Sequence, residues 1–171
     1  MKYIQRTKAP VRIRRNVESY AEPYLEDESL QENTHCIRCG AIYAAGRWYL
    51  KGQAPAEDSP GLEIHETLCP ACRKQRDRVP GGIVKLSGTF INEHREEIFN
   101  LIHNESRKAQ AVNPLERIMD IQSDANETTI TTTNEKLAQR IGRALHNAYS
   151  GCVEYQFGDD IKAVRVNWRR D

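Results

Sequence analysis

The clearest periodic pattern of hydrophobic positions runs from Leu137 to Ala148, where apolar residues recur at i, i+4, i+8 and i+11. This spacing places them on one face of an α-helix. Asn134 stands just before the pattern, where its short side chain suits an N-cap, and Gly151 follows as a residue that ends helices. We therefore predict a helix that begins after Asn134 and ends before Gly151.

A second helix is predicted over Glu93–Ala111. Its apolar stripe is formed by Ile98, Leu101, Ile102 and Ala109. The pair Asn113-Pro114 follows this stretch, and a residue that precedes proline disfavours the helical conformation. The helix should therefore end shortly before Pro114.

Short segments that favour β-structure surround these two helices. They are Ile83–Leu86, Leu115–Ile121, Thr128–Thr133, Cys152–Phe157 and Ile161–Trp168. The last two are separated by Gly158-Asp159-Asp160, which predicts a hairpin. The resulting order is β-α-β-β-α-β-β. For residues 81–171 we expect a two-layer α/β sandwich, in which both helices cover one face of a largely antiparallel sheet.

Residues 36–80 have a different organisation, with two cysteine pairs and few apolar positions. Gly46–Gly52 is expected to be a short strand that ends in a turn, Gln53–Gly61 a loop and Leu62–Leu68 a returning strand. Two short strands beside two cysteine turns are typical of a zinc ribbon or a rubredoxin-like unit. The predicted fold class of the whole chain is therefore α+β, with this small module preceding the sandwich.

The cysteine pairs predict a metal site. Their four members are Cys36, Cys39, Cys69 and Cys72. Two residues between the thiolates of each pair let both sulfurs point inward, and two such turns complete a tetrahedral shell. A closed shell of four thiolates favours one structural Zn²⁺ over catalysis, which needs an open coordination position.

Iron is the alternative occupant, because an all-thiolate site also accepts it. The 29 residues between the pairs, and the Cys-x-x-Cys-Gly and Cys-Pro-x-Cys patterns, are similar to rubredoxins, although Arg73 stands where rubredoxins carry glycine. We expect His35 and His65 to lie outside the metal shell. Cys152 opens a predicted strand and is expected to pack there as a small apolar side chain.

Charge and hydropathy exclude some functions. Lys+Arg 25 against Asp+Glu 24 nearly cancel in the 171-residue chain, so net charge points to no partner. No run approaches the ~18 apolar residues of a membrane span, and the N-terminus has no apolar signal region. Cysteines in CxxC pairs suit a reducing compartment. We therefore expect a cytoplasmic protein with no membrane partner.

Residues 1–35 are expected to form an arm without regular structure. Its first fifteen residues hold six bases and no acid, whereas Glu18–Glu32 holds six acids and no base. Two interpretations stay open: a solvated tail, or a basic arm that becomes ordered on a polyanion.

Further bases follow the second cysteine pair and line one face of the last predicted helix. With those of the arm, they predict contacts to an RNA phosphate backbone. The candidate RNA-binding residues are Lys2, Arg6, Lys8, Arg12, Arg14, Arg15, Arg38, Arg73, Lys74, Arg76, Arg78, Lys136, Arg140 and Arg143. The motifs of nucleotide-binding loops, serine hydrolases and zinc proteases are absent, so we expect no enzymatic activity and no small-molecule substrate.

Several stretches together carry a resemblance to a known family. They are Cys36–Gly40, Cys69–Arg73, Gly82–Gly88, His94–Ile98, Asn113–Ile118, Thr131–Thr133, Leu137–His146 and Val164–Arg169. From Cys36 onward, over about four-fifths of its length, the chain resembles a family of small bacterial proteins of unassigned function. These are grouped with the zinc-binding N-terminal part of the archaeal and eukaryotic ribosome export adapter named for nonsense-mediated decay. The resemblance implies zinc, association with RNA or the ribosome, and no known catalytic activity.

Three functions therefore remain open from the sequence. The favoured one is a zinc-binding accessory protein that contacts RNA or the ribosome, through the rRNA phosphate backbone. The second is an adapter that uses the cysteine module to dock a protein partner. The third is a one-electron carrier with iron in the four-cysteine site.

Overall fold

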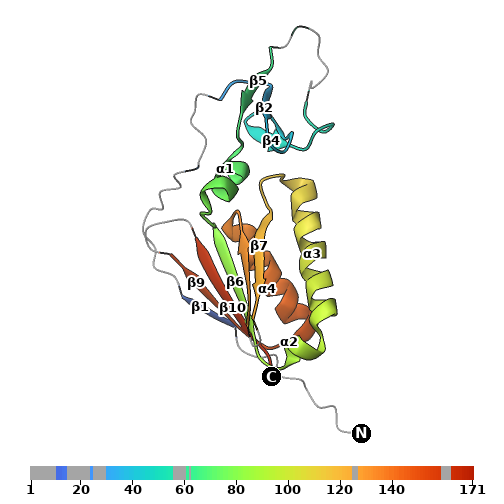
Figure 1. Ribbon diagram of the computed structural model, residues 1–171, viewed down its shortest axis with the longest axis vertical. Coiled ribbons are helices and arrows are strands. Elements are labelled where there is room, and N and C mark those ends of the chain that lie inside the picture. Colours follow the sequence, from blue (N-terminus) through green and yellow to red (C-terminus); the bar gives the residue numbers. More distant parts are fainter. Residues whose placement is uncertain are drawn as a thin grey trace.

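The computed structural model describes residues 11–14, 24, 30–55, 61, 63–124, 127–158 and 163–171. Within these ranges the chain forms four helices and two mixed sheets, so the predicted α+β class is confirmed (Figure 1). The elements are β1 (Val11–Arg14), β2 (Thr34–Cys36), β3 (Ile42–Ala44), β4 (Arg47–Tyr49), β5 (His65–Thr67), α1 (Pro70–Asp77), β6 (Gly82–Ser87), α2 (Phe90–Glu93), α3 (Arg95–Val112), β7 (Ile118–Ser123), β8 (Glu127–Thr132), α4 (Glu135–Tyr149), β9 (Cys152–Phe157) and β10 (Val164–Arg169).

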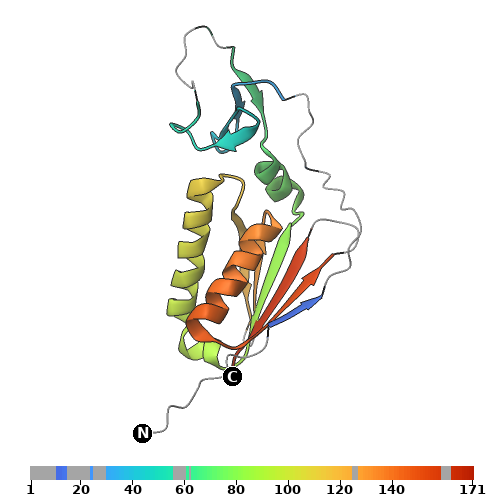
Figure 2. The same ribbon diagram turned by 180° about the vertical axis from the view of Figure 1, so that it is seen from behind.

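The larger sheet has the strand order β1-β9-β10-β6-β8-β7. Strand β10 lies at its centre, antiparallel to β9 and parallel to β6. The remaining pairs are antiparallel except β1 with β9, which is parallel. Helices α3 and α4 lie on one face of this sheet, and no helix of the described residues covers the opposite face (Figures 1 and 2).

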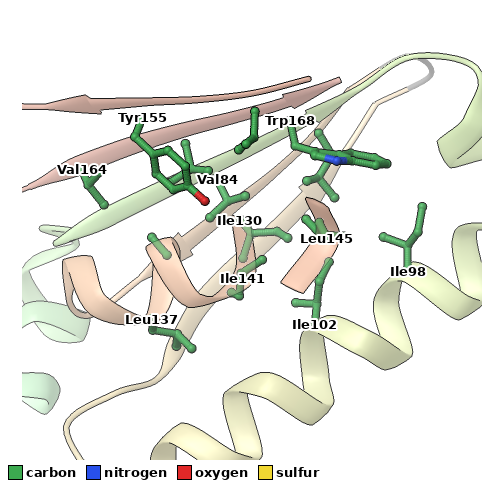
Figure 3. Packing of buried hydrophobic residues seen from close by; sticks show 14 of the residues in the cluster. Val84, Ile98, Ile102, Ile130, Leu137, Ile141, Leu145, Tyr155, Val164 and Trp168 are labelled. Atoms are coloured by element: carbon green, nitrogen blue, oxygen red, sulfur yellow. The ribbon is translucent and has the colours of Figure 1, made fainter. Parts of the chain in front are cut away.

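The main hydrophobic core fills the space between the sheet and the helices. Helix α4 packs directly on the central strands, and α3 packs on α4. In Figure 3, Ile141 and Leu145 of α4 face Val84 of β6, and Ile102 of α3 reaches the same layer. Most residues of the apolar stripes predicted for both helices belong to this core, but Leu101 is only partly buried and Ala148, the last residue of the α4 stripe, is exposed because it lies in the final turn.

Gly142 explains how closely α4 approaches the sheet. A Cβ atom at this position would lie 2.6 Å from Val166 Cγ1 and 3.0 Å from the Tyr155 hydroxyl. Real side chains do not tolerate the shorter contact, so the helix can sit this close only because residue 142 is glycine.

The ends of α4 lie as predicted. The Asn134 side-chain oxygen accepts a hydrogen bond from the Leu137 N–H at 3.1 Å, which makes it the N-cap. At the other end the backbone turns into positive φ at Ser150 and Gly151. Helix α3 begins two residues later than predicted, because a separate short helix, α2, occupies Phe90–Glu93.

The N-terminal arm needs a correction. Residues 1–35 were expected to lack regular structure, but Val11–Arg14 form β1, which pairs with β9 at the edge of the larger sheet. The alternation of apolar and basic residues in Val-Arg-Ile-Arg suits such a strand. The module likewise begins before Cys36, since β2 starts at Thr34. Of the arm, residues 1–10, 15–23 and 25–29 lie outside the described part of the chain.

The cysteine module is built on the smaller sheet, of order β4-β3-β2-β5. Only β4 and β5 correspond to predicted strands. Helix α1 was not predicted: Pro70 starts it at N1, where proline's fixed φ favours a helix and its missing N–H costs nothing. The second cysteine pair thus lies at a helix N-terminus, not in a plain turn.

Candidate metal centre

Local backbone geometry brings each cysteine pair to the same point. Cys36 ends β2, and the chain then turns so that the Gly40 N–H donates to the Cys36 carbonyl at 2.9 Å. Gly40 has φ +71°, which glycine adopts readily. Cys69 is the N-cap residue of α1, and Cys72 lies in the first turn of that helix.

The four sulfur atoms all lie within 4.8 Å of one another, close enough to bind one metal ion together. The Sγ atoms of Cys39 and Cys69 are 3.7 Å apart, too far for a disulfide. Four sulfurs at about 2.3 Å from a zinc ion would form a tetrahedron with edges of about 3.8 Å. The donor set and its spacing therefore fit a tetrahedral thiolate site, as the sequence predicted for these four residues.

Burial and hydrogen bonds create an electrostatic problem that a cation would solve. Cys36, Cys69 and Cys72 are buried, whereas Cys39 is exposed. The Cys69 thiol lies against Cys39, which lowers the pKa of Cys39 to about 4 and raises that of Cys69 far above its usual value. Burial also raises the pKa of Cys72. Four sulfurs packed this closely cannot all ionise without a bound metal.

One residue at this site was not predicted. Arg117, from the segment between α3 and β7, donates from Nη2 to Cys39 Sγ at 3.1 Å and from Nη1 to Cys72 Sγ at 3.5 Å. It is 78 positions from Cys39 in sequence. No spacing rule links two residues so far apart, and Arg117 has no basic neighbour in the sequence to draw attention to it.

The two histidines near the cysteines are not part of the four-sulfur group. The His35 Nε2 atom lies 2.9 Å from the Asn33 side-chain oxygen, which orients the ring. His65 is the first residue of β5 and pairs with Thr34 of β2. Both belong to the strands that hold the cluster in place.

The structure separates the predicted RNA-binding residues into different environments. Arg12, Arg38, Arg78, Lys136 and Arg143 are exposed. Lys2, Arg6, Lys8 and Arg15 lie outside the described residues, and Arg14 belongs to β1.

Other predicted RNA-binding cations are less accessible to a phosphate group. Lys74 is buried and Arg73 half-buried. Arg76 lies 2.6 Å from the adjacent Asp77 carboxylate, and Arg140 lies 2.9 Å from Glu105. These contacts leave Arg76 and Arg140 with part of their charge already compensated.

The structure has two notable hollows, of which the first borders the cysteine module and the second lies on the helices of the larger part. The first, of about 620 Å³, is bounded by Trp48 and Lys74 of the cysteine module and by Leu115 and Lys136 of the larger part. The second, of about 820 Å³, is an open groove between α3 and α4 lined by the cations of α4 and by Glu105. The exposed bases Lys136 and Arg143 therefore border a concave surface.

No protein-family model, curated protein or solved structure matches the chain. Among the described residues, no helix has the length and apolar character needed to cross a bilayer.

Proposed function

We propose that the protein is a zinc-binding, non-enzymatic accessory protein that contacts the phosphate backbone of RNA, in keeping with its resemblance to ribosome-associated proteins. The observation that carries the metal part is the group of four sulfurs within 4.8 Å, three of them buried. We infer that the smaller sheet with its two cysteine turns is a zinc ribbon. The larger sheet with α3 and α4 is then a two-layer sandwich.

Zinc is favoured over iron by the surroundings of the sulfurs. Bases follow Cys72 directly, and Arg117 touches two of the sulfurs. When bound, the ion would supply the folding energy that this small polar module lacks. A closed shell of four thiolates leaves no position for substrate, which supports a structural role.

Metal content tests this part of the proposal. Elemental analysis of protein purified from its native host should find about one zinc per chain. A red protein with thiolate-to-iron charge-transfer bands and a reversible one-electron couple would instead support the electron-carrier alternative.

The RNA part of the proposal rests on the exposed bases along the open groove of α4. Lys136 and Arg143 line this groove, and backbone contacts of this kind give affinity with little sequence preference. The N-terminal bases remain candidates from the sequence for further phosphate contacts.

Ribosome co-sedimentation and RNA binding across a salt series test the RNA part. Replacing Lys136 and Arg143 by Gln should reduce the log–log salt slope by about 0.7–0.9 for each lost phosphate contact. Lys85→Gln is the matched control, because Lys85 pairs with Glu127 on the helix-free face. Replacing Lys2, Arg6 and Lys8 by Gln tests the bases that precede β1 in the same assay and leaves that strand in the sheet. Absence of binding at low salt would reject RNA and favour the protein-adapter alternative.

A further inference from the structure

Arg117 is the contact through which the larger part of the protein reaches the metal centre. It lies outside the cysteine module, yet its guanidinium donates to sulfurs of both cysteine pairs, Cys39 of the first and Cys72 of the second. A planar guanidinium presents several N–H groups in a fixed arrangement, which suits such a bridging contact.

The arginine is held in place at both its backbone and its side chain. Its backbone N–H donates to Thr133 Oγ1 at 2.9 Å, and its carbonyl accepts from the Thr133 N–H at 2.9 Å. Its Nε donates to the Pro114 carbonyl at 2.5 Å. These bonds fix Arg117 to Thr133, between β8 and α4, and to Pro114, so the guanidinium is preorganised toward the sulfurs.

The positive charge of Arg117 gives its contact with the sulfurs an electrostatic role. Four thiolates around a divalent ion carry a net charge of about −2, and burial makes such a charge costly. A guanidinium against two of the sulfurs offsets part of it and donates charge-assisted hydrogen bonds. We propose that Arg117 is a positioning residue of the metal centre, which strengthens metal binding and makes the docking of the cysteine module on the α/β part depend on the metal.

In the described part of the chain, apolar packing at this junction is sparse, so we expect docking to depend on the metal. The cores of the two parts are separate, and among the described residues Leu115 is the hydrophobic side chain of the α/β part that packs on the cysteine cluster. Leu115 and Arg117 lie on the same short segment, which also forms a wall of the 620 Å³ cavity. Metal loss would therefore loosen the segment and open the cavity together.

The inference rests on the proposed metal binding, and its test separates the two. We compare wild type with Arg117→Met and Arg117→Lys. The matched control is Arg107→Met, because Arg107 is an exposed residue of α3 that contacts Asn104. Zinc affinity is measured by chelator competition on the full chain.

Removing an outer hydrogen-bond partner of a metal site typically weakens binding by about 10- to 100-fold. We expect this loss of zinc affinity for Arg117→Met. Arg117→Lys should show a smaller loss, because lysine keeps the positive charge but lacks the planar guanidinium. The control Arg107→Met should show none.

Two further readouts distinguish this role from simple packing. With Co²⁺ in the site, loss of the N–H···S bonds should move the thiolate-to-cobalt bands of Arg117→Met to longer wavelength, because the sulfurs become more electron-rich. In hydrogen exchange, zinc should protect residues 113–117 in wild type and not in Arg117→Met. Unchanged zinc affinity and cobalt bands in Arg117→Met would overturn the inference, whereas failure of wild type to bind zinc would overturn the proposed function.

Discussion

Replacing Cys72 by Ser tests whether the metal supports only the cysteine module. Cys72 is buried in the first turn of α1, and the change leaves three sulfurs for the ion. Zinc contributes about 10–16 kcal/mol to the folding of small structural sites, and the module's own apolar core is small. We therefore expect the module to unfold, together with α1.

The size of the expected signal follows from the helix lengths. Helix α1 has 8 residues, whereas α2, α3 and α4 have 4, 18 and 15. Loss of α1 alone removes 8 of these 45 residues, a little under one-fifth of the helical signal in far-ultraviolet circular dichroism.

Urea unfolding of the remaining helices should stay cooperative, because their core is complete without the module. Cys152→Ser is the control, an exposed cysteine outside the sulfur group that undergoes the same chemical change. A loss of helix well beyond one-fifth would show that the two parts fold as one unit and would refute the reasoning.

The α/β part offers further tests by chemical denaturation. Gly142→Ala should destabilise by about 1–3 kcal/mol despite alanine's better helix propensity, because the new methyl group collides with the stiff side chain of Val166. A stability gain would contradict that packing. Asn134→Ala should cost about 1 kcal/mol through loss of the helix cap, whereas Asn134→Asp should retain most of it. Glu105→Gln should cost less than about 1 kcal/mol at pH 7. Hydrogen bonds from Lys108 and Arg140 hold the pKa of Glu105 below its usual 4.5. The stability that these ion pairs add is therefore fully present above pH 4.5 and is lost as the pH falls through the lowered pKa. Wild type and Glu105→Gln should then have equal urea midpoints in strong acid.

The elements of the α/β part were predictable because their signals are local. The apolar repeat after Asn134 and the turn residues between strands depend on neighbours a few positions apart. Bounds were less predictable: β7 begins at Ile118 and not at Leu115, and in the segment before it Leu115 packs on the cysteine cluster and Arg117 donates to its sulfurs. The set of four cysteines was predictable for the same local reason, through the two CxxC spacings.

Sequence patterns did not predict the pairing of strands that lie far apart in the chain. Strand β1 has only four residues, and its place beside β9 depends on a partner about 140 positions away. In isolation such a segment has no reason to be a strand, because a single short strand satisfies none of its backbone hydrogen bonds. Helix α1 was missed for another reason: the second cysteine pair was taken to form a turn, although Pro70 between its cysteines stands at the first helical position, where proline is favourable.

The number of basic residues in a stretch of sequence does not define an RNA-binding surface. Lys74 and Arg76 belong to one basic stretch, but the first is buried and the second lies against a neighbouring carboxylate. Arg117 stands alone in sequence and was ignored, yet it approaches the sulfur group most directly. A cation's availability to phosphate depends on what the fold has already placed beside it, since a paired charge must give up one partner to gain another. The exposed bases bordering the groove of α4, Lys136 and Arg143, are therefore better candidates for RNA than the denser cluster after Cys72.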